Sequence, residues 1–156
     1  MKPRYNLITA SSGAYQAMVG LERHLAACSL DTKLIHMIKL RASQINGCAY
    51  CIDMHWKDAR AMGETEQRLY GLDAWEESPY YTDRERAALK WTEALTLIRD
   101  GHAPDAVYDH VRSQFNEQEL ADLTFVIAAI NAWNRMAIAA RSPAGTYKAA
   151  HAEANS

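Results

Sequence analysis

Three side chains that can take part in thiol chemistry lie close together in the sequence. The segment Cys48–His55 reads CAYCIDMH, with Cys51 three residues after Cys48 and His55 four residues after Cys51. In an α-helix, which advances about 100° per residue, these three positions fall on one stripe. The spacing therefore predicts that both thiols and the imidazole face a common environment.

Two thiols at this spacing can form a short disulfide, so a sulfenic acid formed on one thiol can be resolved by the other. The N-terminus of a helix favours the thiolate, because unpaired N–H groups and the helix dipole stabilise negative charge there. His55, one turn after Cys51, is placed to accept the thiol proton directly or through a water molecule. We interpret the segment as a reversible thiol redox site.

Two other interpretations of the same residues stay open at this point. A structural zinc site needs four ligands, and Cys48, Cys51 and His55 provide three. The fourth ligand would have to come through the fold from Cys28, His24 or His36. The cysteines could also be plain core residues, with His55 a hydrogen-bonded buried histidine. We favour the redox interpretation and expect neither a metal ion nor an organic cofactor.

The elements that must position this segment are all expected to be helices. Apolar residues recur at helical period in nearly every segment, and helix caps separate the segments. Asp31 and Gly47 are expected to begin and end the helix before the redox segment, and Thr82 to open a capping box with Glu85. We predict an all-α fold of about six to seven helices, over residues 11–27, 32–46, 48–62, 65–72, 82–99, 104–115 and a long last helix after 116–119.

Length and composition narrow the class of protein. A chain of 156 residues predicts one domain, residues 1–156. Its 49% hydrophobic content excludes a disordered chain, and its formal charge of -2 gives no electrostatic footprint for nucleic acid or an anionic membrane. The apolar stretch 120–140 is interrupted by polar residues, which predicts a buried helix rather than a membrane span. The N-terminus has no apolar run of signal-peptide length, so we expect a cytoplasmic protein.

The segment Leu34–His55, LIHMIKLRASQINGCAYCIDMH, resembles the core of the carboxymuconolactone decarboxylase-like proteins of the alkylhydroperoxidase AhpD type. Residues 63–70 (GETEQRLY), 84–89 (RERAAL) and 130–135 (INAWNR) are similar to the same subgroup. The resemblance covers most of the chain. It implies a compact AhpD-like helical domain, assembly into homotrimers or homohexamers, and a peroxidase activity that uses the cysteine pair.

The resemblance also implies a role for each site residue. Cys51 corresponds to the cysteine that attacks peroxide, Cys48 to the resolving cysteine and His55 to the base. The family pattern has a glutamate in a proton relay twelve residues before the first cysteine, where this chain has His36, and often a histidine where it has Tyr50. A histidine can relay protons but lends no fixed negative charge. His36 would be a surface residue by its helix face alone, whereas the resemblance places it at the site.

The residues and the resemblance together predict a thiol peroxidase that reduces small hydroperoxides. Its disulfide would be reduced by an external dithiol of the lipoyl or thioredoxin type. A second hypothesis is a redox-sensing or scaffolding oligomer whose disulfide forms reversibly with little turnover. A third and less favoured one is lactone decarboxylation, because that branch of the superfamily does not need the redox pair.

Overall fold

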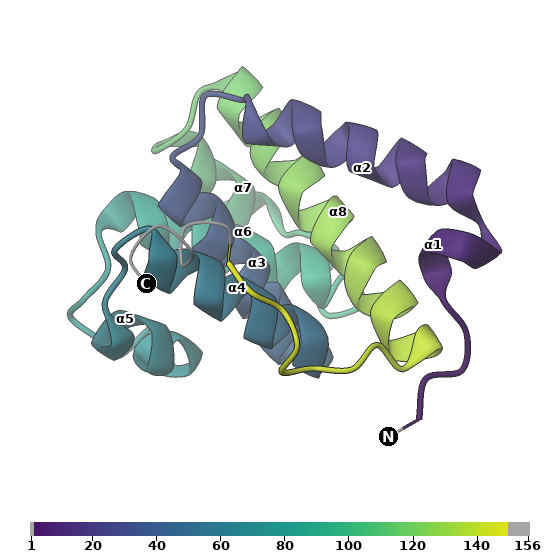
Figure 1. Cartoon of the computed structure of the whole chain (residues 1–156). Helices are drawn as coiled ribbons and strands as arrows, with labels where there is room; N and C mark the ends of the chain where they lie inside the picture. Colours follow the sequence, from purple (N-terminus) through teal and green to yellow (C-terminus); the bar gives the residue numbers. More distant parts are fainter. Residues whose placement is uncertain (1, 150–156) are drawn as a thin grey trace.

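The computed structural model describes residues 2–149, and every regular element in this range is a helix (Figure 1). This confirms the predicted all-α fold. The elements are α1 (Leu7–Ala10), α2 (Ser12–Ala26), α3 (Thr32–Asn46), α4 (Ala49–Ala61), α5 (Glu66–Tyr70), the 3-10 helix η1 (Gly71–Ala74), α6 (Asp83–Thr96), α7 (Asp105–Arg112) and α8 (Glu117–Ala140).

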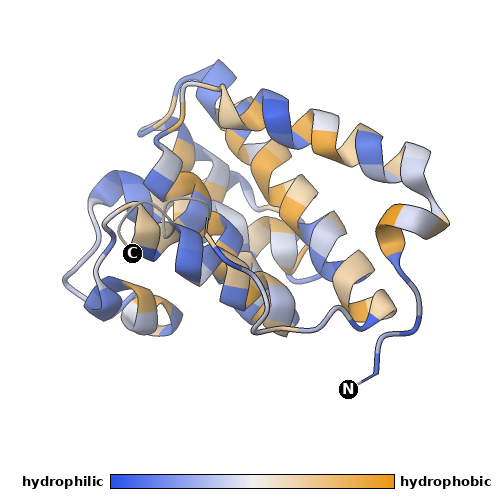
Figure 2. Ribbon diagram, in the orientation of Figure 1, coloured by the Kyte–Doolittle hydropathy of each residue, from blue (hydrophilic) through white to orange (hydrophobic). Residues whose placement is uncertain are grey.

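Helices α3 and α8 form the centre of the domain. Helix α3 packs against α4, α6 and α8, and α8 also contacts α2 and α6. Hydrophobic residues run along much of α8 (Figure 2), and Leu123, Val126 and Ile130 are fully buried. By length and composition alone α8 could cross a membrane, but these contacts identify it as the core helix of the domain. The prediction of a buried helix at 120–140 is therefore consistent with the packing.

The predicted caps explain where α3, α6 and α8 begin. Asp31 accepts a hydrogen bond from the backbone N–H of Leu34 at 3.1 Å, and Gly47 ends α3 in the left-handed region with φ 67°. Thr82 and Asn116 each form a complete capping box, at the start of α6 and α8. The predicted starts of these three helices thus agree with the side-chain hydrogen bonds that cap them.

Several elements differ from the prediction. Helix α7 ends at Arg112 rather than near residue 115, and the helix predicted over residues 65–72 is divided into α5 and η1. Helix α6 ends at Thr96 rather than near residue 99, because Leu97 already leaves the helical region with φ -96° and ψ 45°. Helix α1 was not expected. It begins because the Asn6 side chain accepts hydrogen bonds from the backbone N–H groups of Ile8 and Thr9.

The segment after α8 returns across the molecule along α4 (Figure 1). The Lys57 ammonium group donates a hydrogen bond to the Tyr147 carbonyl at 3.0 Å, and the Gly145 N–H donates to Asp53 at 3.1 Å. The segment is irregular from Ser142, as the sequence predicts. Helix α4, which carries the redox segment, is thereby held between α3 and the C-terminal segment.

Candidate active site

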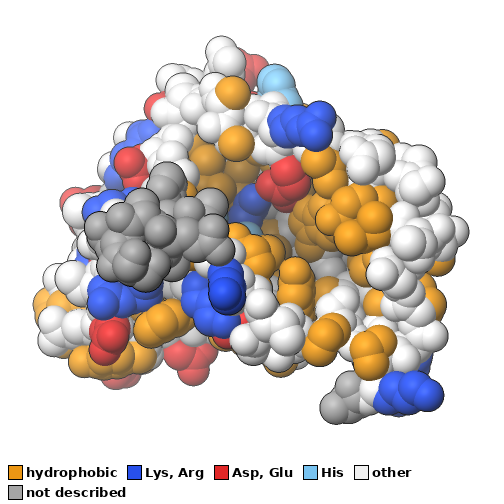
Figure 3. Space-filling view, in the orientation of Figure 1, with side chains coloured by type: hydrophobic (Ala, Val, Ile, Leu, Met, Phe, Trp, Pro, Cys, Tyr) orange, Lys and Arg blue, Asp and Glu red, His pale blue; other side chains and the backbone are white. Residues whose placement is uncertain are grey.

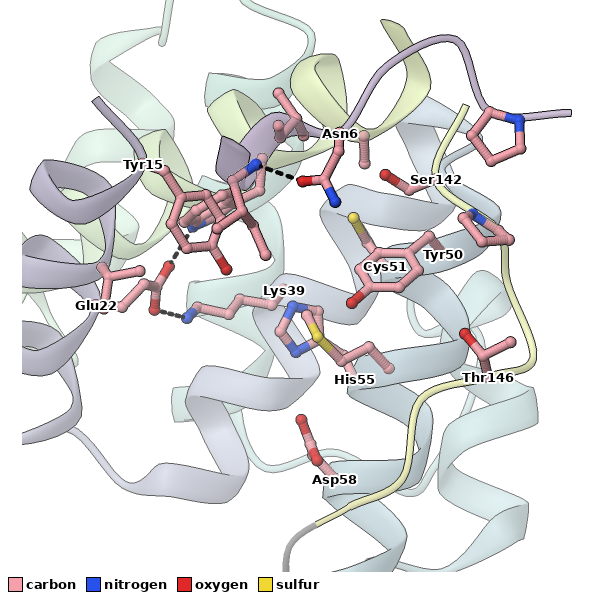
Figure 4. Close-up of a pocket in the computed structure, with 18 of the residues that line it drawn as sticks. Asn6, Tyr15, Glu22, Lys39, Tyr50, Cys51, His55, Asp58, Ser142 and Thr146 are labelled. Carbon is pink, nitrogen blue, oxygen red and sulfur yellow. Dashed lines mark hydrogen bonds and ion pairs between the residues drawn. The ribbon is translucent and has the colours of Figure 1, made fainter. Parts of the chain in front are cut away.

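A cavity of about 710 Å³ opens beside α3 and α4, and its walls include residues from α2, α8 and both ends of the described chain. Figure 3 shows this face of the molecule hollowed near its centre, with hydrophobic side chains around the hollow. About half of the polar side chains in the cavity come from α3 and α4, and the rest come from α2, α8 and the two ends of the described chain (Figure 4). Those with chemistry to offer are Glu22, His36, Lys39, Tyr50, Cys51, His55 and Asp58.

The two cysteines of the redox segment lie at the start of α4. Cys48 is the N-cap and Cys51 sits in the first turn, which brings their Sγ atoms to 2.8 Å from one another. Both thiols are free and 1% exposed, in a small apolar cluster with Ala42, Ile130 and Ala137. Cys51 lines the cavity, whereas Cys48 lies behind it. Disulfide formation therefore requires only a small movement of the side chains.

The surroundings of the pair shift the pKa values of the two thiols in opposite directions. The Cys51 thiol beside Cys48, helped by backbone N–H groups of the first turn and by the Asn134 side chain, lowers the pKa of Cys48 to about 7. The same contact, together with burial, raises the pKa of Cys51. These opposite shifts favour the thiolate on Cys48 and the protonated thiol on Cys51, which lines the cavity.

The histidine predicted as the base does lie in the cavity, but it faces α3. The Nδ1 atoms of His55 and His36 are 3.3 Å apart, so one ring donates a hydrogen bond to the other. Cys51 contacts Cys48 instead, and no hydrogen bond between His55 and Cys51 occurs within residues 2–149. A proton leaving Cys51 must therefore reach His55 through a water molecule or another side chain.

Burial lowers the pKa of His55 well below its ordinary value, and the positive charge of Lys39 adds to the effect. Burial also lowers the pKa of His36, although the Asp58 carboxylate opposes the shift. Both imidazoles are therefore neutral near pH 7. A neutral His55 has a free lone pair and can accept a proton, and its lowered pKa makes it a weak base.

His36 is the residue for which helix periodicity and family resemblance disagreed, and the structure places it in the cavity. Its side chain is 15% exposed. Helix α4 covers the face of α3 that carries it, so two faces of α3 are buried rather than one. His36 is buried because a second helix contacts α3, and the periodicity of α3 alone gives no information about that contact.

Several polar residues of the cavity were not anticipated from the sequence. Lys39 is 7% exposed and pairs with Glu22 at 2.5 Å, and Glu22 also accepts a hydrogen bond from the Trp133 indole at 2.9 Å. Burial raises the pKa of Tyr50, which therefore stays protonated in the cavity beside Cys51. Asp58 lies one turn after His55, and its i, i+3 spacing is the signal that could have singled it out.

The remaining candidates lie away from this cluster. Cys28 is partly buried and packs against the main core, as expected. His24, His102 and His110 are exposed, and His151 lies outside the described residues. Tetrahedral zinc would hold two thiolates about 3.8 Å apart, so the 2.8 Å between the sulfur atoms favours the redox interpretation over structural zinc.

Comparisons with known proteins agree with the family that the sequence resembles. The model of the carboxymuconolactone decarboxylase family matches residues 13–94. The uncharacterized protein YdfG of Bacillus subtilis is 42% identical over 139 residues, which are 89% of this chain and 95% of YdfG.

Two solved structures share the fold. One is a protein of unknown function from Agrobacterium tumefaciens, whose name proposes an AhpD role in antioxidant defence. It has a TM-score of 0.90 at 43% identity, over 94% of this chain and 100% of that one. The other is an uncharacterized peroxidase-related protein with an AhpD core from Ralstonia eutropha, with a TM-score of 0.79 at 18% identity, over 89% and 74% of the two chains. The second likeness shows the fold alone, and together they confirm the AhpD-like helical fold.

Proposed function

Because the chain belongs to the carboxymuconolactone decarboxylase family, we propose that its AhpD-like domain is a thiol-dependent peroxidase that reduces small hydroperoxides. One observation carries the proposal. Two free thiols lie with their sulfur atoms 2.8 Å apart, and one of them lines a cavity of about 710 Å³. A substrate in the cavity can therefore reach one sulfur while the second waits behind it.

In the first step the Cys51 thiolate attacks the terminal oxygen of the hydroperoxide. An S–O bond forms, the O–O bond breaks, and the alkoxide takes a proton and leaves as an alcohol. In the second step the Cys48 thiolate attacks Cys51, the S–S bond forms, and hydroxide leaves as water after taking a proton. The pair has then lost two electrons to the peroxide. An external dithiol returns them by two thiol–disulfide exchanges and is itself oxidised to a disulfide.

Position and electrostatics support different tasks for the two cysteines. Cys51 lines the cavity and is therefore the sulfur that a peroxide meets first. Cys48, with a pKa of about 7, is already a nucleophile when Cys51 has become a sulfenic acid. The lowered pKa thus supports Cys48 as the resolving residue.

Cys51 must lose its proton before it attacks, and its raised pKa makes this the demanding step. His55 is the acceptor we propose, because burial keeps it neutral. The Tyr50 hydroxyl lies in the same cavity and points inward (Figure 4), where it can pass the proton from Cys51 towards His55. His36 and Asp58 extend the path beyond His55. Nδ1 of His36 lies 3.3 Å from Nδ1 of His55, and Oδ2 of Asp58 lies 4.0 Å from Nδ1 of His36.

The test is to mix reduced protein with a hydroperoxide and count the thiols that remain. Wild type should lose two thiols per chain, and Cys28 should stay reduced. Cys48→Ser should lose one thiol and accumulate a sulfenic acid that a trapping reagent labels, and Cys51→Ser should lose none in the same time. Equal losses in the two variants would show that Cys51 is not the attacking residue.

The same electrostatics favour a second candidate function. A raised pKa on Cys51, with no direct hydrogen bond to His55 among the described residues, suits a thiol that reacts slowly. Such a pair would serve as a redox sensor whose disulfide changes its assembly. Steady-state assays with a lipoyl-type or thioredoxin-type dithiol separate the two functions, because a sensor is oxidised once and a peroxidase turns over.

We further propose that the domain acts in the cytoplasm as a homotrimer or homohexamer. Large hydrophobic side chains remain on the surface of the single chain, among them Phe125 at 57% and Ile138 at 47% exposure on α8. Large exposed hydrophobic side chains are a common feature of subunit interfaces. Light scattering of the purified protein measures its mass, and a monomer at micromolar concentration would contradict the assembly.

A further inference from the structure

Two histidines and a carboxylate converge at the end of the cavity away from the thiols. His36 comes from α3, and His55 and Asp58 come from one face of α4. One ligand atom from each lies within 4.8 Å of the other two. The Nδ1 atoms of the histidines are 3.3 Å apart, and Oδ2 of Asp58 is 4.0 Å from Nδ1 of His36. Two imidazole nitrogens and one carboxylate oxygen form a donor set typical of zinc and other divalent transition metals.

These distances are close to those of a bound ion. Tetrahedral zinc holds its nitrogen ligands about 2.0–2.1 Å away, which sets two of them about 3.4 Å apart. The two Nδ1 atoms already have this separation. Oδ2 of Asp58 lies 4.0 Å from Nδ1 of His36 and would have to move closer to the histidines for all three to bind one ion. Little rearrangement is therefore needed to complete the three ligands.

The surrounding residues hold this geometry in place. The Tyr147 hydroxyl donates a hydrogen bond to Oδ1 of Asp58 at 2.7 Å, so Oδ2 is the oxygen that faces the histidines. Hydrogen bonds of this kind orient the ligands of natural metal sites. His55 is 5% exposed, and the side chains of His36 and Asp58 are each 15% exposed. All three nevertheless line the cavity, which leaves a fourth position open to it.

The charges nearby permit a cation. The Lys39 ammonium group lies close enough to act on both histidines, but Glu22 pairs with it at 2.5 Å. Glu22 and Asp58 against Lys39 give the group a formal charge of -1. A divalent ion would therefore enter a site of opposite net charge.

We propose that His36, His55 and Asp58 bind a divalent transition-metal ion, with the fourth position open to the cavity. His36 is the residue that makes the site, because it supplies the second imidazole. The hydrogen bond between the two histidines and the metal compete for the same pair of nitrogens. The site does not use Cys48 or Cys51.

Calorimetric titration with Zn²⁺ tests the site directly. The protein is first stripped with a chelator, and both Cys48 and Cys51 are replaced by Ser so that thiols cannot bind the ion. One Zn²⁺ should bind per chain, and His36→Gln or Asp58→Asn should each weaken binding at least tenfold. Tyr147→Phe should weaken it by about tenfold. The matched control, His24→Gln at an exposed position, should leave the affinity unchanged.

Absence of zinc binding, or full affinity in His36→Gln, would overturn the proposal. Circular dichroism shows whether each variant is folded. A nearly isosteric change such as Asp58→Asn keeps the test valid if another variant unfolds. Co²⁺ provides a second measurement, because its visible absorption should indicate nitrogen and oxygen ligands and should disappear in His36→Gln.

A regulatory consequence rests on the proposed function, whereas the binding test does not. Zinc on Nδ1 of His55 would withdraw electron density from the ring that accepts the Cys51 proton and would replace its hydrogen bond to His36, so Zn²⁺ should slow thiol oxidation by peroxide in the wild-type protein. In His36→Gln the rates with Zn²⁺ and with chelator should be equal. Zinc binding in a protein without peroxidase activity would leave the site standing and refute the proposed function alone.

Discussion

The hydroxyl of Tyr147 donates a hydrogen bond to Oδ1 of Asp58 at 2.7 Å, across 89 positions of sequence. Asp58 lies on α4, one turn after His55, and Tyr147 lies in the irregular segment after α8. Burial and the Asp58 carboxylate raise the pKa of Tyr147, so its hydroxyl stays protonated and remains a donor. One hydrogen bond thus connects the C-terminal segment to the polar group of the cavity.

Removing this hydroxyl should destabilise the protein. We expect Tyr147→Phe to lower the free energy of unfolding by about 1–2 kcal/mol, because the Asp58 carboxylate loses a partner in a largely buried position. Chemical denaturation measures the change. The exposed Tyr108→Phe is the control and should unfold like wild type. An unchanged Tyr147→Phe would show that water replaces the hydroxyl without loss.

The lowered pKa of Cys48 predicts that a thiolate forms near neutral pH, which can be followed by absorbance. As pH rises through about 7, the pair should lose its first proton and the ultraviolet absorbance of a thiolate should appear. The Cys51 thiol is the largest cause of the lowered pKa, so Cys51→Ala should move this step to higher pH. Both proteins carry Cys28→Ser, which removes the third thiol. A first step near pH 8.5 in the protein that retains both cysteines would contradict the assignment.

The partly buried ion pair between Lys39 and Glu22 should matter for stability. Glu22→Gln leaves the Lys39 ammonium group, 7% exposed, without its carboxylate. We expect a loss of about 2–3 kcal/mol in the free energy of unfolding, below the range for a fully buried pair because the Glu22 side chain is 27% exposed. The double variant Lys39→Met, Glu22→Leu should recover part of the loss. Equal stability of Glu22→Gln and wild type would mean that Lys39 reaches solvent in the variant.

Tyr50 should affect the rate of reaction and not the stability of the fold. If its hydroxyl carries the Cys51 proton towards His55, Tyr50→Phe should slow sulfenic acid formation by about tenfold or more. Stopped-flow kinetics of a single oxidation measure the rate. Thermal unfolding of the variant should match wild type, which separates a loss of proton transfer from a loss of structure. An unchanged rate would show that the Tyr50 hydroxyl does not carry the proton from Cys51 to His55.

His36→Glu tests the position at which this chain departs from the family pattern. A carboxylate there would face His55 in place of an imidazole and would supply the fixed negative charge that His36 lacks. We expect peroxidase turnover to rise in the variant, measured with a chelator present so that metal binding does not contribute. His36→Gln is the matched control, since it keeps the size of the side chain without the charge. Turnover that is equal in wild type and both variants would exclude a role for His36 in the relay.

The helices could be predicted from the sequence because their signals are local. Thr82 with Glu85 and Asn116 with Glu119 form capping boxes within four residues, and Gly47 ends α3 by its own backbone conformation. Helix α1 has only four residues, too few for a hydrophobic period to develop. Elements were thus predictable where a few neighbouring residues decide them.

The site was predictable to the extent that it lies on one helix. Cys48 is the N-cap of α4, and Cys51 and His55 lie one turn apart on that helix, so their proximity follows from their spacing alone. The ring orientation of His55 depends on His36, which is 19 residues away on α3, and the orientation of Asp58 depends on Tyr147. These contacts arise only when the helices pack, so no pattern within one helix could reveal them.

The walls of the cavity have a divided origin. Cys51 and the two histidines stand on α3 and α4, whereas other lining residues, among them Tyr5, Ile8, Pro143 and Thr146, lie near the two ends of the described chain. Substitutions at these end positions would reshape the space offered to a substrate without disturbing the redox pair. The domain can therefore change which molecule it admits while its reacting groups stay the same, a separation of selectivity from reactivity within one small fold.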